Sequence, residues 1–390
     1  TGMARGFTRQ LADLVELVAV ADRNTIRLNL AKERLGAPKA YTDHLQLLAD
    51  PDVDAVMVTT PDWTHADIVV AALAAGKHVY CEKVMATTLE DANRMAAAVA
   101  KSDKVLYIGH NARWGGAMQK LHELVQAGEV GNVVHVWAKR FVEGSKYWHR
   151  WHRQSQYSGG LLLHKGSHQL DLLNWFAGSS PARVMAMGGL DVYKPRNPPP
   201  ATRCLNCPEK ATCLEYLDIT KGELREMYLE AEHEDGYIRD QCVFLPGSDS
   251  YDNAVVTLEY ANGVRGSYTE VHFAPVSDSQ SEVGVFGDRG LAIARGWSEV
   301  ILEKKPSRER LHFPIERVSG GHGGADMRVV RDFLLCILEG REPLSGVEHG
   351  WDSTVAGLAA NLSIKEGTMV HIDRPNRRLL VGGAAHAVAG

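Results

Sequence analysis

The apolar residues follow one pattern in the first part of the chain and a different pattern in the rest. The first part alternates short, unbroken apolar runs with segments whose apolar residues recur at helical spacing. The runs are residues 17–22, 53–60, 79–81 and 105–108, and the helical segments are residues 7–14, 65–75 and 88–100. Unbroken runs are typical of strands that are buried on both faces of a parallel sheet. The alternation therefore predicts a doubly wound α/β sheet.

The later part predicts an α+β domain. Residues 253–260 and 264–271 alternate apolar and polar positions, and Ala261-Asn262-Gly263 between them is a hairpin signal. Further strand patterns are residues 133–138, 280–286, 291–295 and 300–302, and helical patterns are residues 167–177 and 325–338. We expect a large, open, mostly antiparallel sheet that helices cover on one face. Its other face invites pairing with a second copy, so we expect a homo-oligomer, either a dimer or a tetramer.

The start of the chain has the pattern of a dinucleotide-binding (Rossmann) domain. Thr1 to Gly6 is similar to the turn after a first strand, so we expect that strand to precede Thr1. Asp22 ends the next strand, about 20 residues after a glycine turn, where an acid binds the adenosine ribose in such domains. Asp22 favours NAD, and the neighbouring Arg23 leaves NADP open. The alternative for Asp22 is a turn or helix-capping acid.

These patterns divide the chain into two domains. We expect the Rossmann domain at residues 1–112, with the last helix of the chain packing back on it. Residues 113–390 would form the α+β domain for substrate binding and oligomerisation. An insertion at about 193–246 is rich in proline, cysteine and charge. Long loops inside a compact domain are usually functional or separately stabilised.

Composition excludes several classes of function. The 390 residues are 45% hydrophobic and 23% charged, with a formal net charge of −5. Because there is no basic excess, we do not expect nucleic-acid binding. No apolar run reaches the roughly 18 residues that a membrane span needs. We expect a cytoplasmic enzyme that acts on a small molecule.

Lys83 is the most informative single residue. Residues 79–81 form a short apolar strand that ends in Glu82 and Lys83. Ligands of open α/β sheets bind just outside the carboxyl ends of the strands. Most lysines are only exposed surface groups, but this position at the sheet edge favours a role in chemistry.

Short motifs along nearly the whole chain point to one family. They are Val20-Ala21-Asp22, Thr59-Thr60-Pro61 with His65, Gly76 to Lys83, Gly109-His110-Asn111 with Arg113-Trp114, Gly159-Gly160, Gly166-Ser167-His168 with Asp171, Tyr260 to Gly263, Gly321 to Gly324 with Asp326, and Ala359-Ala360 with Ser363. In this order and spacing the chain resembles the Gfo/Idh/MocA family of NAD(P)-dependent oxidoreductases. The resemblance implies hydride transfer between a sugar or polyol carbon and nicotinamide.

The resemblance also implies catalytic residues. We expect His168 to be the base that removes the hydroxyl proton. Lys83 would donate a hydrogen bond to the developing alkoxide or carbonyl oxygen, although the two roles could be exchanged. The family usually has proline where this chain has Val84, which leaves the backbone of that turn open. It often has aspartate where this chain has His164, so a Lys-His-His set is expected here. Paired histidines could alternatively bind a metal or belong to the core.

Two sets of binding residues follow. The cofactor-binding residues that we expect are Gly2, Met3, Ala4, Asp22, Arg23, Thr59, Thr60, Pro61, His65, Glu82, Lys83 and Asn111. The substrate-binding residues that we expect are Lys83, Arg113, Trp148, His149, Trp151, His164, Lys165, His168 and His322. The alternative for Arg113 is a structural ion pair, and the alternative for the cluster at 148–152 is a domain interface.

Four cysteines lie in the insertion: Cys204, Cys207, Cys213 and Cys242. A tetrahedral structural zinc site is the interpretation that we favour, because Cys-x-x-Cys is a natural half of one. Two disulfides would need an oxidising compartment, and free thiols are the third option.

The resulting hypothesis is an NAD- or NADP-dependent sugar or polyol dehydrogenase. One alternative is a redox-neutral glycosidase that oxidises C3 of a glycoside transiently and then eliminates the aglycone. Another is a non-catalytic, sugar-sensing protein that has kept the fold.

Overall fold

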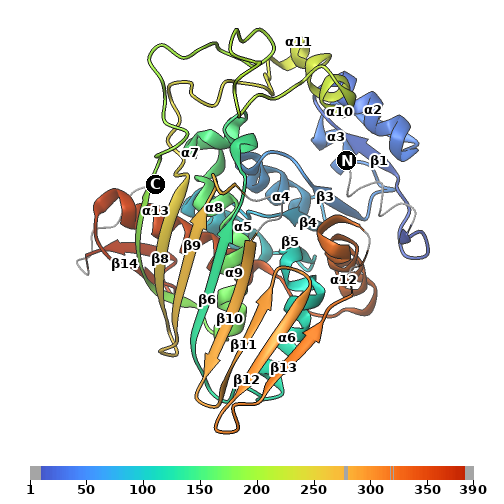
Figure 1. Cartoon of the computed structure of the whole chain (residues 1–390). Coiled ribbons are helices and arrows are strands. Elements are labelled where there is room, and N and C mark those ends of the chain that lie inside the picture. Colours follow the sequence, from blue (N-terminus) through green and yellow to red (C-terminus); the bar gives the residue numbers. More distant parts are fainter. Residues whose placement is uncertain (1–9, 276–279, 317, 319, 383–390) are drawn as a thin grey trace.

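The computed structural model describes residues 10–275, 280–316, 318 and 320–382. Five short parallel strands form the core of the N-terminal part (Figure 1). Strands β1 (Ala19–Ala21) and β2 (Lys39–Tyr41) pair with each other, and β3 (Ala55–Val58), β4 (His78–Glu82) and β5 (Leu106–Gly109) pair in that order. Their parallel pairing, with β4 and β5 mostly buried, confirms the doubly wound prediction.

Helices alternate with these strands, and local signals set their limits. The helices are α2 (Thr25–Leu35), α3 (His44–Leu48), α4 (His65–Ala74) and α5 (Leu89–Val99). Helix α2 begins after Asn24, whose side chain accepts a hydrogen bond from the Arg27 N–H, and it ends at Gly36 with a φ of 68°. The predicted helix at 7–14 is wrong beyond Gln10, since residues 11–14 form a bend and a turn. Residues 7–9 lie outside the described part.

A ten-stranded sheet dominates the C-terminal part, and this confirms the α+β prediction. Its order is β13-β12-β11-β10-β6-β9-β8-β7-β14-β15, and every pair is antiparallel except β6 with β9. The strands are β6 (Val133–Phe141), β7 (Pro181–Gly189), β8 (Asn253–Tyr260), β9 (Arg265–Val271), β10 (Gln280–Gly287), β11 (Gly290–Arg295), β12 (Glu299–Lys304), β13 (Arg310–Pro314), β14 (Val370–Asp373) and β15 (Arg378–Val381). Along β8, alternate residues from Ala254 to Tyr260 are buried, as expected for a sheet covered on one face.

Helices cover that buried face. They include α6 (Gly116–Gln126), α9 (Ser167–Ala177) and α13 (Val347–Glu366). Helix α12 (Ala325–Glu339) packs instead against β4 of the N-terminal part and the turn η2 (Asn111–Trp114), so the expectation that residues 325–338 cover the large sheet is wrong. Helix α13 also packs against α5. The buried Trp351 of α13 donates a hydrogen bond from Nε1 to Asn93 Oδ1 at 2.9 Å. A Cβ on Gly350 would lie 2.7 Å from Ile108 Cγ1, so only glycine allows this close approach. The last long helix thus holds both parts of the chain together.

The insertion leaves the sheet after β7 and returns before β8. It contains only short helical turns: α10 (Gly222–Leu224), η5 (Arg225–Leu229) and α11 (Glu232–Asp235). Figure 1 shows these turns beside α2, at the far side of the N-terminal part. Within the described residues, none of the helices combines the length and apolar character needed to traverse a bilayer.

Candidate active site

Lys83 lies where the two parts of the chain meet. It follows β4 directly, only 9% of its surface is exposed, and its peptide bond to Val84 is cis. Its Nζ donates a hydrogen bond to the backbone carbonyl of His164 at 2.9 Å. His164 ends the short helix α8 (Leu161–His164) of the C-terminal part. Burial, followed by the nearby Lys165, lowers the pKa of Lys83 to about 8, and Asp62 opposes the shift.

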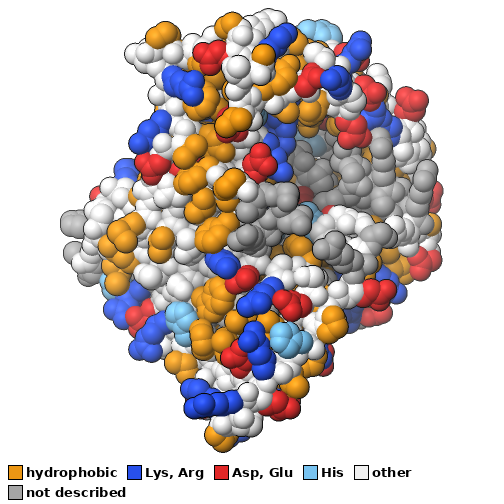
Figure 2. Space-filling model, in the orientation of Figure 1, with side chains coloured by type: hydrophobic (Ala, Val, Ile, Leu, Met, Phe, Trp, Pro, Cys, Tyr) orange, Lys and Arg blue, Asp and Glu red, His pale blue; other side chains and the backbone are white. Residues whose placement is uncertain are grey.

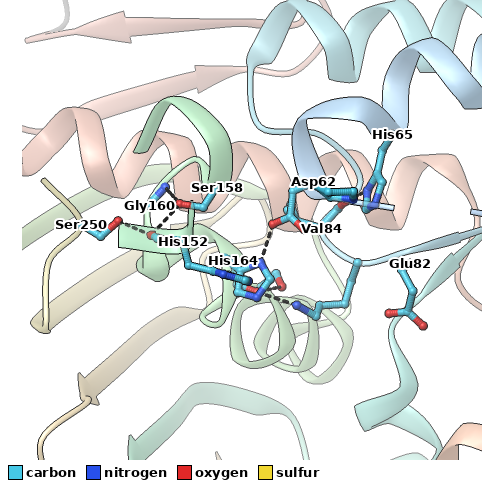
Figure 3. Close-up of polar contacts among 12 residues, drawn as sticks. Asp62, His65, Glu82, Val84, His152, Ser158, Gly160, His164 and Ser250 are labelled. Carbon is cyan, nitrogen blue, oxygen red and sulfur yellow. Dashed lines mark hydrogen bonds and ion pairs between the residues drawn. The ribbon is translucent and has the colours of Figure 1, made fainter. Parts of the chain in front are cut away.

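Asp62 is a site residue that the sequence prediction missed. It begins the turn η1 (Asp62–Thr64) after β3, and its carboxylate bonds to Nδ1 of the His164 ring (Figure 3). Both side chains are buried. Burial raises the pKa of Asp62 to about 7 and lowers the pKa of His164 well below its usual range. Both shifts favour the uncharged forms, so the pair holds one proton between two buried partners.

The Asp62–His164 pair resolves one departure from the family pattern. Where the family often has an aspartate, this chain has His164, and a carboxylate reaches that place from the other part of the chain. The signal for it was an acid directly after Thr59-Thr60-Pro61, at the carboxyl end of a parallel strand. The sequence could not show that these two segments meet.

His168 begins the next helix, α9, rather than continuing α8. Lys165 and Gly166 separate the two helices, and a Cβ on Gly166 would lie 2.0 Å from the Leu162 carbonyl. The idea that His164 and His168 share one helical face is therefore wrong. His168 Nδ1 is buried and has no hydrogen-bond partner among the described residues. Burial and then Lys83 lower the pKa of His168 well below its usual range. Its imidazole is therefore neutral at physiological pH and able to accept a proton.

Aromatic rings form a wall beside these groups. Trp151 stacks on His152 with ring centroids 3.6 Å apart, and His152 meets His164 edge-on at 4.3 Å. Trp63, from the N-terminal part, lies edge-on to Trp151 at 5.0 Å. Such a wall suits the apolar faces of a sugar or cyclitol ring. His152 and Trp63 belong to it although the sequence prediction did not include them among the site residues.

Lys165 is a second lysine of unusual character here. Its ammonium lies 4.9 Å from the centroid of the Tyr147 ring. The side chain keeps some exposed surface, but the loss of water around it lowers its pKa to about 7. The basic neighbours Arg140 and Lys146 add to that shift. The assignment of Lys165 to substrate binding stays a prediction.

Asn111 brings a third segment to the site. Its Nδ2 donates to Asp326 Oδ1 at 2.7 Å, and His322 Nδ1 lies 2.8 Å from the same oxygen. His322 remains half-exposed. Asn111 Oδ1 is buried and has no hydrogen-bond partner among the described residues. Glu82 lies nearby on β4 and accepts a hydrogen bond from the Tyr80 hydroxyl at 3.3 Å.

The dinucleotide site fits what the described residues offer. Asp22 follows β1, and 35% of its side chain is exposed. Thr59 and Thr60 are exposed at the end of β3. The unpartnered buried atoms Asn111 Oδ1 and His168 Nδ1 are suited to a bound polar group at the other end. The predicted cofactor residues Gly2, Met3 and Ala4 lie outside the described residues.

Several predicted site residues have structural contacts instead. The buried Arg113 donates two hydrogen bonds to Asp171 at 2.7 Å each and one to the Leu344 carbonyl at 2.8 Å. This engagement corrects its assignment to the substrate pocket. His65 is fully buried, with its ring nitrogens 2.8 Å and 3.0 Å from the carbonyl oxygens of Val84 and Thr60. It therefore braces the loops around the cofactor site and does not line it.

Two residues of the 148–152 cluster also belong to the framework. The fully buried Trp148 packs on Tyr193, with ring centroids 4.4 Å apart. His149 lies between the carbonyl oxygens of Gln241 and Glu215, at 2.6 Å and 2.9 Å from its two ring nitrogens. Both residues anchor the insertion, which corrects their assignment to the substrate pocket.

The zinc prediction is not supported. Cys204, Cys207, Cys213 and Cys242 line one small cavity, and all four are free thiols. Within the described residues, His, Cys, Asp and Glu form no group of three or more that could hold a metal ion. Burial raises the pKa of the Cys204 thiol to about 11. The alternative of free thiols therefore agrees with the structure, and the paired-histidine metal site has no support either.

Fold and site together define an oxidoreductase that uses a nicotinamide dinucleotide. The family model "Oxidoreductase family, NAD-binding Rossmann fold" matches residues 3–110, and the model "Oxidoreductase family, C-terminal alpha/beta domain" matches residues 122–372. The chain belongs to the Gfo/Idh/MocA family of oxidoreductases.

Relatives and solved structures agree with this placement. YteT of Bacillus subtilis (strain 168), named only as an oxidoreductase, is 30% identical over 364 residues, which are 83% of this chain and 82% of that protein. Myo-inositol 2-dehydrogenase of Thermotoga maritima is 26% identical over 371 residues, 93% of each chain. The structure of levoglucosan dehydrogenase in complex with NADH and levoglucosan matches with a TM-score of 0.74 at 19% identity, covering 96% of this chain and 95% of that one. This last likeness shows the fold alone.

Proposed function

We propose that the protein is an NAD- or NADP-dependent dehydrogenase of a sugar or polyol, which oxidises a secondary alcohol carbon. The observation that carries the proposal is the buried set of Lys83, His168 and the Asp62–His164 pair beside an aromatic wall. Relatives named as dehydrogenases of inositol and reductases of an anhydrosugar support the class of substrate. The division into domains at residues 112 and 113 is part of the same proposal.

The site residues divide the work of moving the proton. His168 accepts the hydroxyl proton, because its ring is neutral and its Nδ1 has no hydrogen-bond partner in the part of the chain that the structure describes. Lys83 donates a hydrogen bond to the same oxygen and stabilises the negative charge that develops there. Asp22, Thr59, Thr60 and Asn111 would hold the dinucleotide. When bound, its nicotinamide accepts the hydride that leaves the alcohol carbon.

The Asp62–His164 pair positions these groups. The His164 carbonyl holds the Lys83 ammonium at 2.9 Å, and the Asp62 carboxylate fixes the His164 ring. Because Asp62 also lies close enough to raise the pKa of Lys83, it keeps more of that lysine protonated. A hydrogen-bond donor is thereby ready for the alkoxide in a site with little water.

A panel of inositols, sugars and glycosides with NAD and NADP tests the proposed function. We expect NADH or NADPH to accumulate in proportion to an oxidised product with at least one polyol or sugar. Release of an aglycone without net formation of reduced cofactor would instead identify the redox-neutral glycosidase. Binding of a sugar with no turnover of either kind would indicate the sensing protein and contradict the proposal.

We further propose a homo-oligomer that forms through the outward face of the sheet. That face exposes Met187, Val255 and Phe286 at 71%, 45% and 42%. Figure 2 shows hydrophobic side chains gathered over the strands on this side. Exposed apolar patches of this kind often mark interfaces between subunits. Light scattering on the protein as it elutes from a size-exclusion column would test the oligomeric state, and a monomeric mass at micromolar concentration would contradict the proposal.

We also propose a cytoplasmic location. The six free cysteines support a reducing compartment.

A further inference from the structure

The insertion makes an unusual set of contacts with the N-terminal part. Its segment 222–235, here called the strap, lies against helix α2 (Figure 1). The strap comes from the C-terminal part, so these contacts cross between the two parts of the chain. They run from the loop after Asp22 to the last turn of α2. The loop after Asp22 is where the adenosine side of a dinucleotide site lies.

The contacts at the start of α2 surround the loop after Asp22. The buried Asn24 donates from Nδ2 to the Ala231 carbonyl at 2.9 Å. The Glu234 carboxylate accepts from both the backbone N–H and the hydroxyl of Thr25, at 2.5 Å each. A carboxylate at a helix N-terminus is stabilised by the helix dipole and by N–H groups that lack partners in the helix. Asp22 Oδ1 accepts from the next residue but one, the Asn24 N–H, at 2.9 Å.

Ion pairs extend the docking along α2. Arg27 pairs with Asp235 of the strap, and its Nε lies 3.6 Å from Asp22 Oδ2. In the last turn of α2, Arg34 pairs with Glu226. Arg27 is therefore shared between two carboxylates and is not free to receive a phosphate. The strap places its own acids around the position that selects between NAD and NADP.

The same part of the strap that contacts the start of α2 is also bonded to the rest of the insertion. Arg203 forms a bidentate pair with Glu232 at 3.0 Å and also bonds to the buried Asp240 at 2.7 Å. The ring of His149 lies between two carbonyl oxygens of the insertion, as described above. A segment that is anchored in one domain and ion-paired to the other is suited to close a site that both domains share.

We propose that the strap is the closing wall of the adenosine side of the dinucleotide site, and that its carboxylates select against a 2′-phosphate. The inference rests on the proposed function, since it assigns a cofactor-specificity role at the same site. It makes two statements that can be measured: undocking of the strap accompanies release of the cofactor, and Glu234 favours NADH over NADPH.

A charge-swap cycle tests the docking. The rate of NADH dissociation is measured by stopped-flow fluorescence after mixing the complex with excess NAD. Arg34→Glu and Glu226→Arg should each speed release about fivefold, and the double variant should return to within about twofold of the original rate. Glu230→Arg is the matched control: it lies in the strap, makes the same charge change and breaks an ion pair with Arg225 of the strap, not an ion pair with α2. Equal rates in Glu226→Arg, Glu230→Arg and the unmodified protein would overturn the proposal.

Equilibrium titration with NADH and NADPH tests the selectivity. Glu234→Gln should reduce the ratio of the NADPH and NADH dissociation constants about threefold, because it removes a negative charge from the side of the site where Asp22 lies. Glu230→Gln should leave this ratio unchanged. An unchanged ratio in Glu234→Gln would overturn the selective role of the strap. If the unmodified protein binds neither dinucleotide, the proposed function fails as well. If the protein binds NADH but the charge-swap variants release it at the same rate as the unmodified protein, the proposal about the strap is wrong and the proposed function stands.

Discussion

The two ends of the proposed dinucleotide site are built on opposite electrostatic principles. At the catalytic end, Lys83, Asp62 and His164 are all buried. Burial raises the pKa of Asp62 and lowers the pKa values of Lys83 and His164, so it favours the uncharged form of each group. On the helix that leads away from the adenosine end, the ion pair of Arg34, in the last turn of α2, with Glu226 leaves 21% and 45% of the side chains exposed. Burying a charge costs solvation free energy, so the buried groups exchange protons readily near neutral pH. An exposed ion pair contributes little to stability and separates readily. The first end is suited to proton transfer and the second to reversible docking.

The largest expected effect comes from removing the buried ammonium. Lys83→Met should lower kcat about a thousandfold, because one hydrogen-bond donor at a developing oxyanion is typically worth that much. Binding of NADH should change little, since the adenosine end is untouched. Steady-state kinetics together with NADH titration measure both quantities. The exposed Lys101→Met is the matched control and should keep full activity. Activity within tenfold of normal in Lys83→Met would contradict the catalytic assignment.

The next effect concerns the pH dependence of the catalytic end. The pKa of Lys83 is about 8, so activity should fall as the pH rises through that value and the ammonium is lost. Asp62 raises the pKa of Lys83 by its negative charge. Asp62→Asn should therefore lower that pKa and move the alkaline limb of kcat to lower pH by about one unit, which reduces activity about tenfold at pH 9 and only about twofold at pH 7.

The direction of that shift separates an electrostatic role from a structural one. A role of Asp62 in holding the fold alone would lower activity at every pH without moving the limb. The matched variant Asp67→Asn, on the exposed face of α4, should leave the profile as it is. A limb that stays near pH 8 in Asp62→Asn would show that the carboxylate does not act on Lys83.

The same contrast explains what the sequence could predict. Apolar periodicity predicted the parallel strands and the antiparallel sheet, because buried faces impose a spacing on each segment. It also placed Lys83 directly after a strand, whereas the assignment of His168 came from the resemblance to the family. The Asp62–His164 pair and the contacts of the strap with α2 join residues far apart in the chain. No local pattern specifies such contacts, because they depend on how the two domains pack.

Arg113 shows the opposite error. It follows a parallel strand, as ligand-binding residues of such sheets do. However, its guanidinium already donates two hydrogen bonds to the buried Asp171. The cysteine spacing misled in a similar way, because it resembles half of a zinc site while the thiols stay free. Residue type and spacing show which chemistry is available, and only the packing shows which groups are already occupied.

The smallest expected effect, a dependence on salt, distinguishes the two ends most directly. Exposed ion pairs are screened as the Debye length falls from about 10 Å at 0.1 M to about 3 Å at 1 M. Raising the salt over this range should speed NADH release about threefold by loosening Arg34 from Glu226. The rate of hydride transfer measured in a single turnover should change less than about twofold, since its charges are buried. In Glu226→Arg the sign should reverse, because salt then screens a repulsion and slows release. Release that responds to salt equally in the unmodified protein and in Glu226→Arg would show that the strap is not held by this pair.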